Sequence, residues 1–281
     1  MITLNNFALK AALENVRATV PLVHCITNYV TVNDCANALL ACGGSPIMSD
    51  EPADVADITT ICGGLVLNIG TLNQQTIEGM RVAGARAAEL GHPIVLDPVG
   101  AGASALRTLT ASNLLDELPI TVVRGNMSEV KALAGAASAT RGVDVNPHDV
   151  VTEENLAESV AFARAFAREA DAIAAITGAI DIVTDGDRAA AITNGTPLMG
   201  KITGAGCMLS CITGAYVTAN QDDPYEATIA ALANEGLAGQ AAAARMTPQD
   251  GNSSFRTFLL DALTTMTGDK LEQGARVQEV A

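Results

Sequence analysis

GKITGAGCMLSCITG, residues 200–214, is a glycine-rich turn that runs into an apolar segment with the pattern of a helix. The free N–H groups of a helix N-terminus, together with the positive end of the helix dipole, form a binding site for anions such as phosphate. Cys207 falls in the first helical turn, where the same field favours a thiolate over a thiol. On this stretch alone, a plain strand-to-helix turn with Cys207 as a buried apolar residue is an equally good interpretation.

Two familiar phosphate-binding loops do not fit this stretch. The dinucleotide fingerprint G-x-G-x-x-G fails because Leu209 stands at its last glycine position. The Walker A pattern starts at Gly195 and continues to Lys201, but Ile202 follows where a Ser or Thr should bind magnesium. Neither template therefore identifies the fold.

The rest of the chain alternates between short apolar strands and helices. Strands are expected at 21–26, 45–48, 65–70, 94–97, 120–123 and 172–178, and helices at 5–18, 30–41, 53–61, 73–90, 126–135 and 153–169. An Asp-Gly turn predicts a hairpin over 182–192. Two Ala-rich helices within 224–245, a helix at 255–266 and a mobile charged tail at 266–281 are expected to follow. The alternation predicts one doubly wound α/β domain, residues 1–281, with a mostly parallel sheet flanked by helices.

The composition restricts the kinds of partner. A formal charge of −15 argues against binding to nucleic acid or to acidic membranes. No run approaches the roughly 18 to 20 apolar residues of a membrane span, and the first residues lack a signal-peptide pattern, so a cytoplasmic protein is expected. The six cysteines include no C-x-x-C pair, and reduced thiols are the expectation. Cys207 and Cys211 share a helical face, where core packing is favoured over a shared metal.

Polar residues follow several of the predicted strands. Asn28 comes after the strand at 21–26, and Asp97 ends the strand at 94–97. Open α/β sheets bind ligands at the carboxyl ends of their strands, so Asp97 is interpreted as a magnesium organiser rather than a turn cap. Asn126 and Glu129 have the spacing of a capping box, which competes with a functional role for Glu129. His24 is interpreted as a hydrogen-bonded core histidine.

Several motifs together, in one order over nearly the whole chain, resemble those of the hydroxyethylthiazole kinases, a family in the ribokinase-like superfamily. The matching stretches are HCITN at 24–28, SPIM at 45–48, LDPVGAG at 96–102, RGNxxE at 124–129, TG at 177–178 and TGAGC at 203–207. The resemblance implies a ribokinase-like fold. It also implies ATP-dependent phosphorylation of the hydroxyl of 4-methyl-5-(2-hydroxyethyl)thiazole, a step of thiamin salvage. The loop at 249–255 departs from the family pattern, which puts only the details of that loop in doubt.

The resemblance also implies roles for individual residues. Asn28 and Met48 would line the thiazole pocket, with Gly204 close to the reacting hydroxyl. Arg124 and Thr177 would contact ATP. The family further implies a homotrimer in which each site lies at a subunit boundary.

The remaining implied roles concern the metal and the proton. Asp97 and Glu129 would organise Mg2+ and its waters. Cys207 stands where most of the superfamily has an aspartate base, and thiazole kinases typically have cysteine there.

These assignments fit the chemistry of phosphoryl transfer, which depends on alignment and on stabilising charge. The N–H groups of Gly204, Ala205 and Gly206 would face the transferred group, and Arg124 would add fixed positive charge. Cys207 is a candidate base for the alcohol. The helix N-terminus would lower its pKa and nearby phosphates would raise it, so the sequence leaves its protonation open.

Three alternatives compete with a thiazole kinase. The first is another ribokinase-like small-molecule kinase, such as a pyrimidine or pyridoxal kinase, which Asn28, Met48 and Cys207 disfavour. The second is a ribokinase-like lyase that repairs hydrated nicotinamide cofactors, although such enzymes keep an aspartate where Cys207 stands. The third is a non-catalytic nucleotide-binding sensor, which would show no thiazole-dependent release of ADP.

Overall fold

The computed structural model describes residues 8–136 and 150–281. Within these ranges the strands form one nine-stranded sheet in the order β2-β1-β3-β4-β5-β6-β7-β8-β9. The strands are β1 (Leu22–Ile26), β2 (Ser45–Ile47), β3 (Gly64–Asn68), β4 (Ile94–Asp97), β5 (Val122–Asn126), β6 (Ile173–Thr177), β7 (Asp181–Thr184), β8 (Ala189–Ile192) and β9 (Val277–Glu279). The strands from β2 to β6 are parallel, and the last three are antiparallel to their neighbours.

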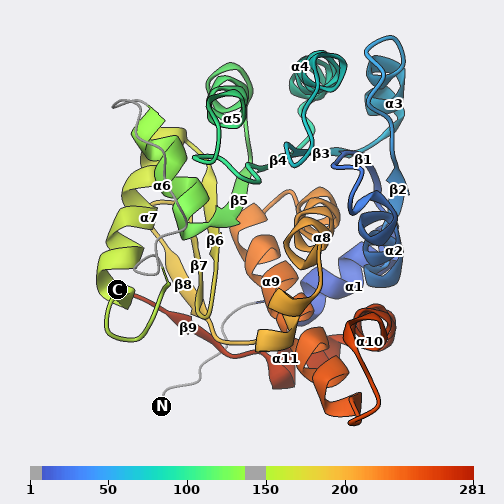
Figure 1. Ribbon diagram of the computed structural model, residues 1–281, viewed down its shortest axis with the longest axis vertical. Coiled ribbons are helices and arrows are strands. Elements are labelled where there is room, and N and C mark those ends of the chain that lie inside the picture. Colours follow the sequence, from blue (N-terminus) through green and yellow to red (C-terminus); the bar gives the residue numbers. More distant parts are fainter. Residues whose placement is uncertain (1–7, 137–149) are drawn as a thin grey trace.

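Helices cover both faces of the sheet (Figure 1). One face carries α1 (Leu9–Thr19), α2 (Val32–Cys42), α8 (Ala205–Ala219), α9 (Pro224–Arg245), α10 (Asn252–Thr265) and α11 (Gly268–Gly274). The other face carries α3 (Val55–Ile61), α4 (Gln74–Leu90), α5 (Ala105–Glu117), α6 (Met127–Ala136) and α7 (Leu156–Ala170). Alternate strand residues supply the two cores: in β3, Val66 packs on the α8 face while Leu65 and Leu67 pack on the other.

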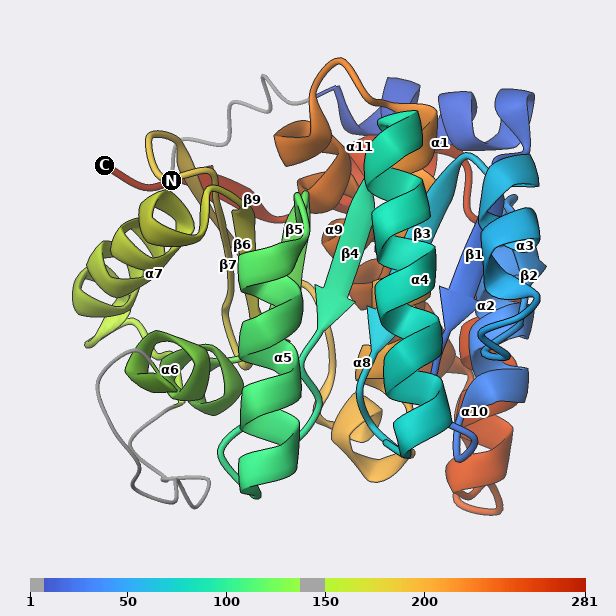
Figure 2. The ribbon, with the colours of Figure 1, turned by 90° about the horizontal axis from the view of Figure 1, so that it is seen from above.

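The strand order changes direction at β1. The chain moves from β1 to β2 through α2, and then returns to the opposite side of β1 to form β3. Figure 2 shows β1, β3 and β4 running in the same direction, so that their carboxyl ends meet at one edge. Such a switch point opens a crevice at the carboxyl ends of the strands, and α8 packs across β1, β3 and β4 beside it.

The predicted doubly wound, mostly parallel sheet flanked by helices is confirmed. Most predicted elements shift by only one to three residues at their ends, as helix and strand ends generally do. The helix predicted at 5–18 is observed from Leu9, and residues 1–7 and 137–149 lie outside the described ranges. No helix among the described residues is long and apolar enough to cross a membrane.

Two predictions about the last third of the chain are wrong. Residues 224–245 form one helix, α9, rather than two. The expected mobile tail at 266–281 is ordered instead, as α11 and β9. Leu271 and Val277 of this segment are buried, and β9 pairs antiparallel with β8, so the segment covers what would otherwise be an exposed sheet edge.

Candidate active site

A chain of hydrogen-bonded side chains runs along the carboxyl edge of the sheet. Asn28, just after β1, donates from Nδ2 to Oδ1 of Asn68 at 3.0 Å, and Asn68 donates to Oδ2 of Asp97 at 2.7 Å. Arg124 continues the chain, since Nη1 lies 3.4 Å from the same Asp97 oxygen and Nη2 lies 2.7 Å from Oγ1 of Thr177. Five neighbouring strands, β1, β3, β4, β5 and β6, therefore each contribute one member.

Asp97 is the most buried member, with no exposed surface. Its Oδ2 also accepts a hydrogen bond from Ser210 on α8 at 2.7 Å, whereas its Oδ1 has no partner among the residues that the structure describes. Burial raises the pKa of Asp97 to about 6, against the opposing effect of the Arg124 guanidinium. An unsatisfied buried carboxylate oxygen is costly, so this atom fits a cation or the hydration shell of one.

The N-terminus of α8 lies against this chain. Gly204 caps the helix with a φ of 91°, a left-handed conformation that favours glycine. A Cβ on Gly206 would stand 2.7 Å from both terminal nitrogens of Arg124. The absence of a side chain at Gly206 therefore lets the guanidinium and the first N–H groups of α8 converge on one point, which is suited to a phosphate.

Cys207 follows Gly206 in the first turn of that helix and is half-buried. Its Sγ accepts a hydrogen bond from Nδ2 of Asn28 at 3.2 Å, which links it to the chain of polar side chains. Burial, followed by the negative charge of Asp97, raises the pKa of Cys207. The shift of this pKa is thus upward, opposite to the thiolate-favouring effect expected of the helix N-terminus.

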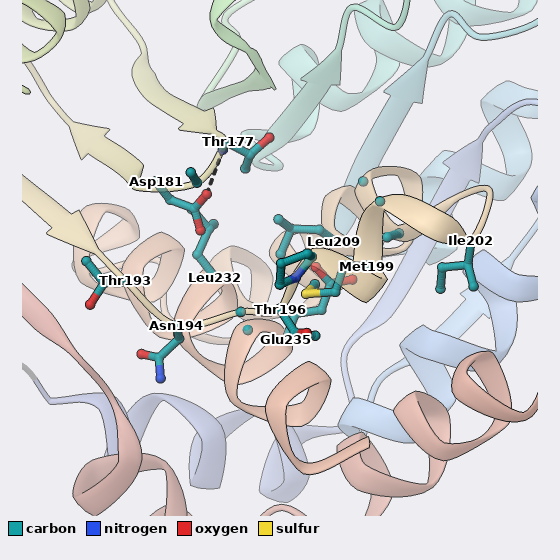
Figure 3. A pocket seen from close by; sticks show the side chains of 18 of the residues that line it. Thr177, Asp181, Thr193, Asn194, Thr196, Met199, Ile202, Leu209, Leu232 and Glu235 are labelled. Atoms are coloured by element: carbon teal, nitrogen blue, oxygen red, sulfur yellow. Dashed lines mark hydrogen bonds between the residues drawn. The ribbon is translucent and has the colours of Figure 1, made fainter. Parts of the chain in front are cut away.

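A cavity of about 640 Å³ lies beside the N-terminus of α8, and we call it the α8 cavity (Figure 3). Arg124, Thr177 and residues 204–206 line one part of it. The 193–200 segment and the α9 residues Leu232 and Glu235 line another. Its volume is that of a typical small-molecule or cofactor site.

The structure brings together some of the predicted residues and separates others. Arg124, Thr177 and the three residues Gly204, Ala205 and Gly206 all line the α8 cavity. Asn28, Asp97 and Cys207 connect to it through hydrogen bonds or through α8 itself. Met48, after β2, packs partly buried against the α8-side core and is not part of the cavity lining.

Glu129 forms the capping box that its spacing predicts. Its Oε2 accepts from the N–H of Asn126 at 2.8 Å, and Oδ1 of Asn126 accepts from the N–H of Glu129 at 2.9 Å. Its Oε1 accepts from the N–H of Gly100 at 2.9 Å. Both carboxylate oxygens of Glu129 are therefore engaged with the backbone, and it influences Asp97 through its charge.

Four residues of the site region were not predicted from the sequence. Asn68 ends β3 in the position that Asp97 holds in β4, and this parallel could have identified it. Ser210 follows Gly206 by one helical turn, which places it on the face of α8 above Asp97. Asp181 and Glu235 line the α8 cavity, and nothing in their sequence context marks them.

The remaining histidine and cysteine predictions can also be placed. His24 is fully buried, and its ring nitrogens lie 2.9 Å from Oγ1 of Thr59 and 2.9 Å from the carbonyl oxygen of Ser49, which confirms a satisfied core histidine. All six cysteines are free thiols.

Known proteins resemble this chain over almost its whole length. The model of the hydroxyethylthiazole kinase family matches residues 13–269. A hydroxyethylthiazole kinase of Clostridium acetobutylicum is 53% identical, covering 96% of this chain and 99% of that protein. One of Methanocella arvoryzae is 45% identical, with 96% and 98% coverage.

Solved structures of other proteins share the fold of this chain. The structure of a hydroxyethylthiazole kinase protein from Pyrococcus horikoshii superposes with a TM-score of 0.86 at 37% identity, covering 97% of this chain and 99% of that one. A pyridoxal kinase from Staphylococcus aureus in complex with ADP has a TM-score of 0.61 at 16% identity, with 93% and 99% coverage. The second likeness concerns the fold alone.

Proposed function

The chain belongs to the hydroxyethylthiazole kinase family, and from this premise we propose that it transfers the γ-phosphoryl group of ATP to the hydroxyl of 4-methyl-5-(2-hydroxyethyl)thiazole. The observation that best supports this site is the convergence of the α8 N-terminus and Arg124 on one side of the α8 cavity. A cavity with an anion-binding point at one end is what a nucleoside triphosphate requires.

ATP would bind in the α8 cavity with its phosphates toward residues 204–206. The N–H groups there and the Arg124 guanidinium would stabilise charge that develops on the transferred group. Thr177, which holds the other terminal nitrogen of Arg124, would keep the guanidinium in place and offer its hydroxyl to the phosphates.

Mg2+ would bind near Asp97, whose unpartnered Oδ1 suits the ion or a water in its shell. When bound, the ion would neutralise phosphate charge. Glu129 was also predicted to organise the metal, but both of its carboxylate oxygens already accept backbone N–H groups. We therefore propose that Glu129 supports the site by fixing the loop at Gly100 and by its charge.

The thiazole alcohol would approach α8 from the side of Cys207 and bind next to Asn28. Met48 would line the same acceptor pocket from farther away. Cys207 would accept the hydroxyl proton as the new bond forms, or position that proton. Asn28 would hold the sulfur through its 3.2 Å hydrogen bond, which also stabilises a thiolate once one forms.

A homotrimer with the acceptor site at a subunit boundary belongs to the same proposal. Tyr29 and Val30 directly follow Asn28 and leave 78% and 58% of their surfaces exposed. Large exposed apolar side chains beside a ligand site support an interface there. A cytoplasmic location fits both the use of ATP and the free thiols.

The reaction itself gives the first prediction. With Mg2+ and ATP present, ADP release should depend on the added thiazole alcohol and should be much slower without it or with pyridoxal in its place. A coupled assay for ADP measures this, and mass spectrometry of the phosphorylated thiazole identifies the product. Equal ADP release with and without the alcohol would contradict the proposal and favour a different acceptor or a sensor.

A second prediction tests the convergence at α8. In a Gly206→Ala variant the new Cβ would lie 2.7 Å from two nitrogens of Arg124, so the guanidinium must move. We expect kcat/KM for ATP to fall by about tenfold or more, the effect of weakening one charge-assisted contact in the transition state. Gly251→Ala is a matched control, since a Cβ at Gly251 meets nothing within 4 Å. Equal losses in both variants would mean that the contact is irrelevant.

A further inference from the structure

Glu235 is a buried carboxyl group in the wall of the α8 cavity. Only 2% of the residue is exposed, and within residues 8–136 and 150–281 its Oε1 has no hydrogen-bond partner. Figure 3 shows Glu235 among the cavity side chains, together with Leu232 of the same helix and with Met199 and Leu209. A polar atom so deeply buried and without a protein partner calls for an explanation, such as a bound water, ion or ligand.

Neighbouring polar side chains of the cavity wall are already engaged. Asn194 donates from Nδ2 to Gln240 and to the carbonyl of Gly274, each at 3.0 Å, and its Oδ1 accepts from the N–H of Arg276 at 2.6 Å. Oδ1 of Asp181 accepts from the N–H of Gly178 at 2.9 Å. Oε1 of Glu235 thus retains hydrogen-bonding capacity that Asn194 and Oδ1 of Asp181 have used.

Glu235 shares its part of the α8 cavity with apolar side chains. It follows Leu232 by one turn on α9, and Leu232, Met199 and Leu209 supply apolar surface to the cavity. Helix α9 lies close to the 194–199 segment, because a Cβ at Gly236 would meet Asn194 at 2.8 Å. An apolar wall with one free polar group is the usual construction for binding a planar base.

The charge on Glu235 depends on two groups that face it from other strands. Burial raises the pKa of Glu235 to about 8, while Arg124 on β5 opposes this shift and Asp181 on β7 adds to it. Burial also raises the pKa of Asp181, to about 7. At neutral pH Glu235 is therefore mainly a neutral acid, which has one O–H donor and one carbonyl acceptor.

We propose that Glu235 selects adenine over guanine by donating its O–H to a ring nitrogen of the base and accepting from the exocyclic amino group. Adenine offers an acceptor nitrogen beside its N6 amino donor, whereas guanine has the acceptor O6 in place of that donor. The ring nitrogen in question is N7, which is an acceptor in both bases. A neutral acid satisfies N7 and the N6 amino group of adenine together, whereas N7 and O6 of guanine are both acceptors and the single O–H can satisfy only one of them. This inference rests on the proposed function only in taking the α8 cavity as the nucleotide site.

The test measures dissociation constants for ATP and GTP by calorimetry, without thiazole, between about pH 6.5 and about pH 9. The wild-type protein should bind ATP about tenfold more tightly than GTP at the lower pH, as expected for one lost hydrogen bond. This preference should decline as the pH rises through about 8, because ionisation removes the donor. Glu235→Gln keeps a donor and an acceptor, so its preference should persist at every pH. Glu235→Leu should lose the preference.

Two further measurements distinguish a specific role of Glu235 from the titration of Asp181 and from a loss of folding. Asp181→Asn removes the other titrating carboxyl, and the pH dependence of the nucleotide preference should survive it. Thermal melting of the apo variants checks folding, and Glu235→Gln serves as the isosteric reference if Glu235→Leu does not fold. A preference in the wild type that is independent of pH, or one lost in Glu235→Gln, overturns the role of Glu235. Failure of the wild type to bind either nucleotide overturns the proposed ATP site as well.

Discussion

Substitution of Cys207 by serine is expected to lower kcat by about 10²- to 10⁴-fold, the range that a positioned general base contributes. The hydroxyl of serine ionises far less readily than a thiol, although it can still accept the hydrogen bond that Asn28 now donates to the sulfur. Because burial raises the pKa of Cys207, kcat/KM of the wild-type enzyme should increase with pH in the alkaline range as the thiolate forms.

Steady-state kinetics at saturating ATP measure both effects. Cys207→Asp supplies a carboxylate at the same place, as in most of the superfamily that the chain resembles, and should recover activity without the alkaline dependence. Cys62→Ser is the control, since Cys62 is also a buried free thiol but caps the C-terminus of α3 and does not line the α8 cavity. An unchanged kcat/KM in Cys207→Ser would remove the proposed role.

Replacement of Arg124 by methionine should damage both activity and stability. The guanidinium faces the N-terminus of α8, and loss of one such charge-stabilising group costs about 10²- to 10³-fold in kcat. Arg124 is also the ion-pair partner of the fully buried Asp97, at 3.4 Å. Removing one partner of a buried pair costs about 3–5 kcal/mol, because the other charge stays behind without compensation.

A double-mutant comparison separates these two effects. In Arg124→Met with Asp97→Asn the uncompensated charge is gone, so the free energy of unfolding in urea should recover while the activity should not. Equal stability of the single and the double variant would show that Asp97 is not charged in the folded protein under those conditions.

Local sequence signals were sufficient for the parts of the site that stand at strand ends. Asp97 ends and Arg124 follows a short apolar run typical of a buried strand, and parallel strands bring their carboxyl ends to one edge. The ATP contact of Arg124, by contrast, was implied by the family resemblance. The spacing of Asn126 and Glu129 likewise predicted a capping box, which is a contact between near neighbours in the chain. Such features depend on a few adjacent residues and are therefore readable without the tertiary structure.

Features that depend on contacts between residues far apart in the chain could not be predicted from the sequence. Glu235 lies in the middle of an Ala-rich helix, and only the packing of α9 against the 194–199 segment turns it into a cavity residue. Glycines such as Gly236 lower helix propensity, yet α9 continues through them because the missing Cβ permits that close contact. The short strand β9 is defined by pairing with β8 rather than by a pattern of its own.

Part of the wall of the α8 cavity is held in place by the segment that contains β9, which is synthesised after the rest of the cavity. The backbone of Gly274 and Arg276 makes hydrogen bonds to Asn194 and to the N–H of Thr193, in the segment that lines the α8 cavity. Residues up to 276 must therefore be synthesised before these hydrogen bonds to the wall of the α8 cavity, the proposed nucleotide site, can form. We expect molecules that a carboxypeptidase has trimmed past Arg276, or translation products shortened to the same point, to remain partly folded but to lose nucleotide binding. A timed digestion followed by a nucleotide-binding assay measures this.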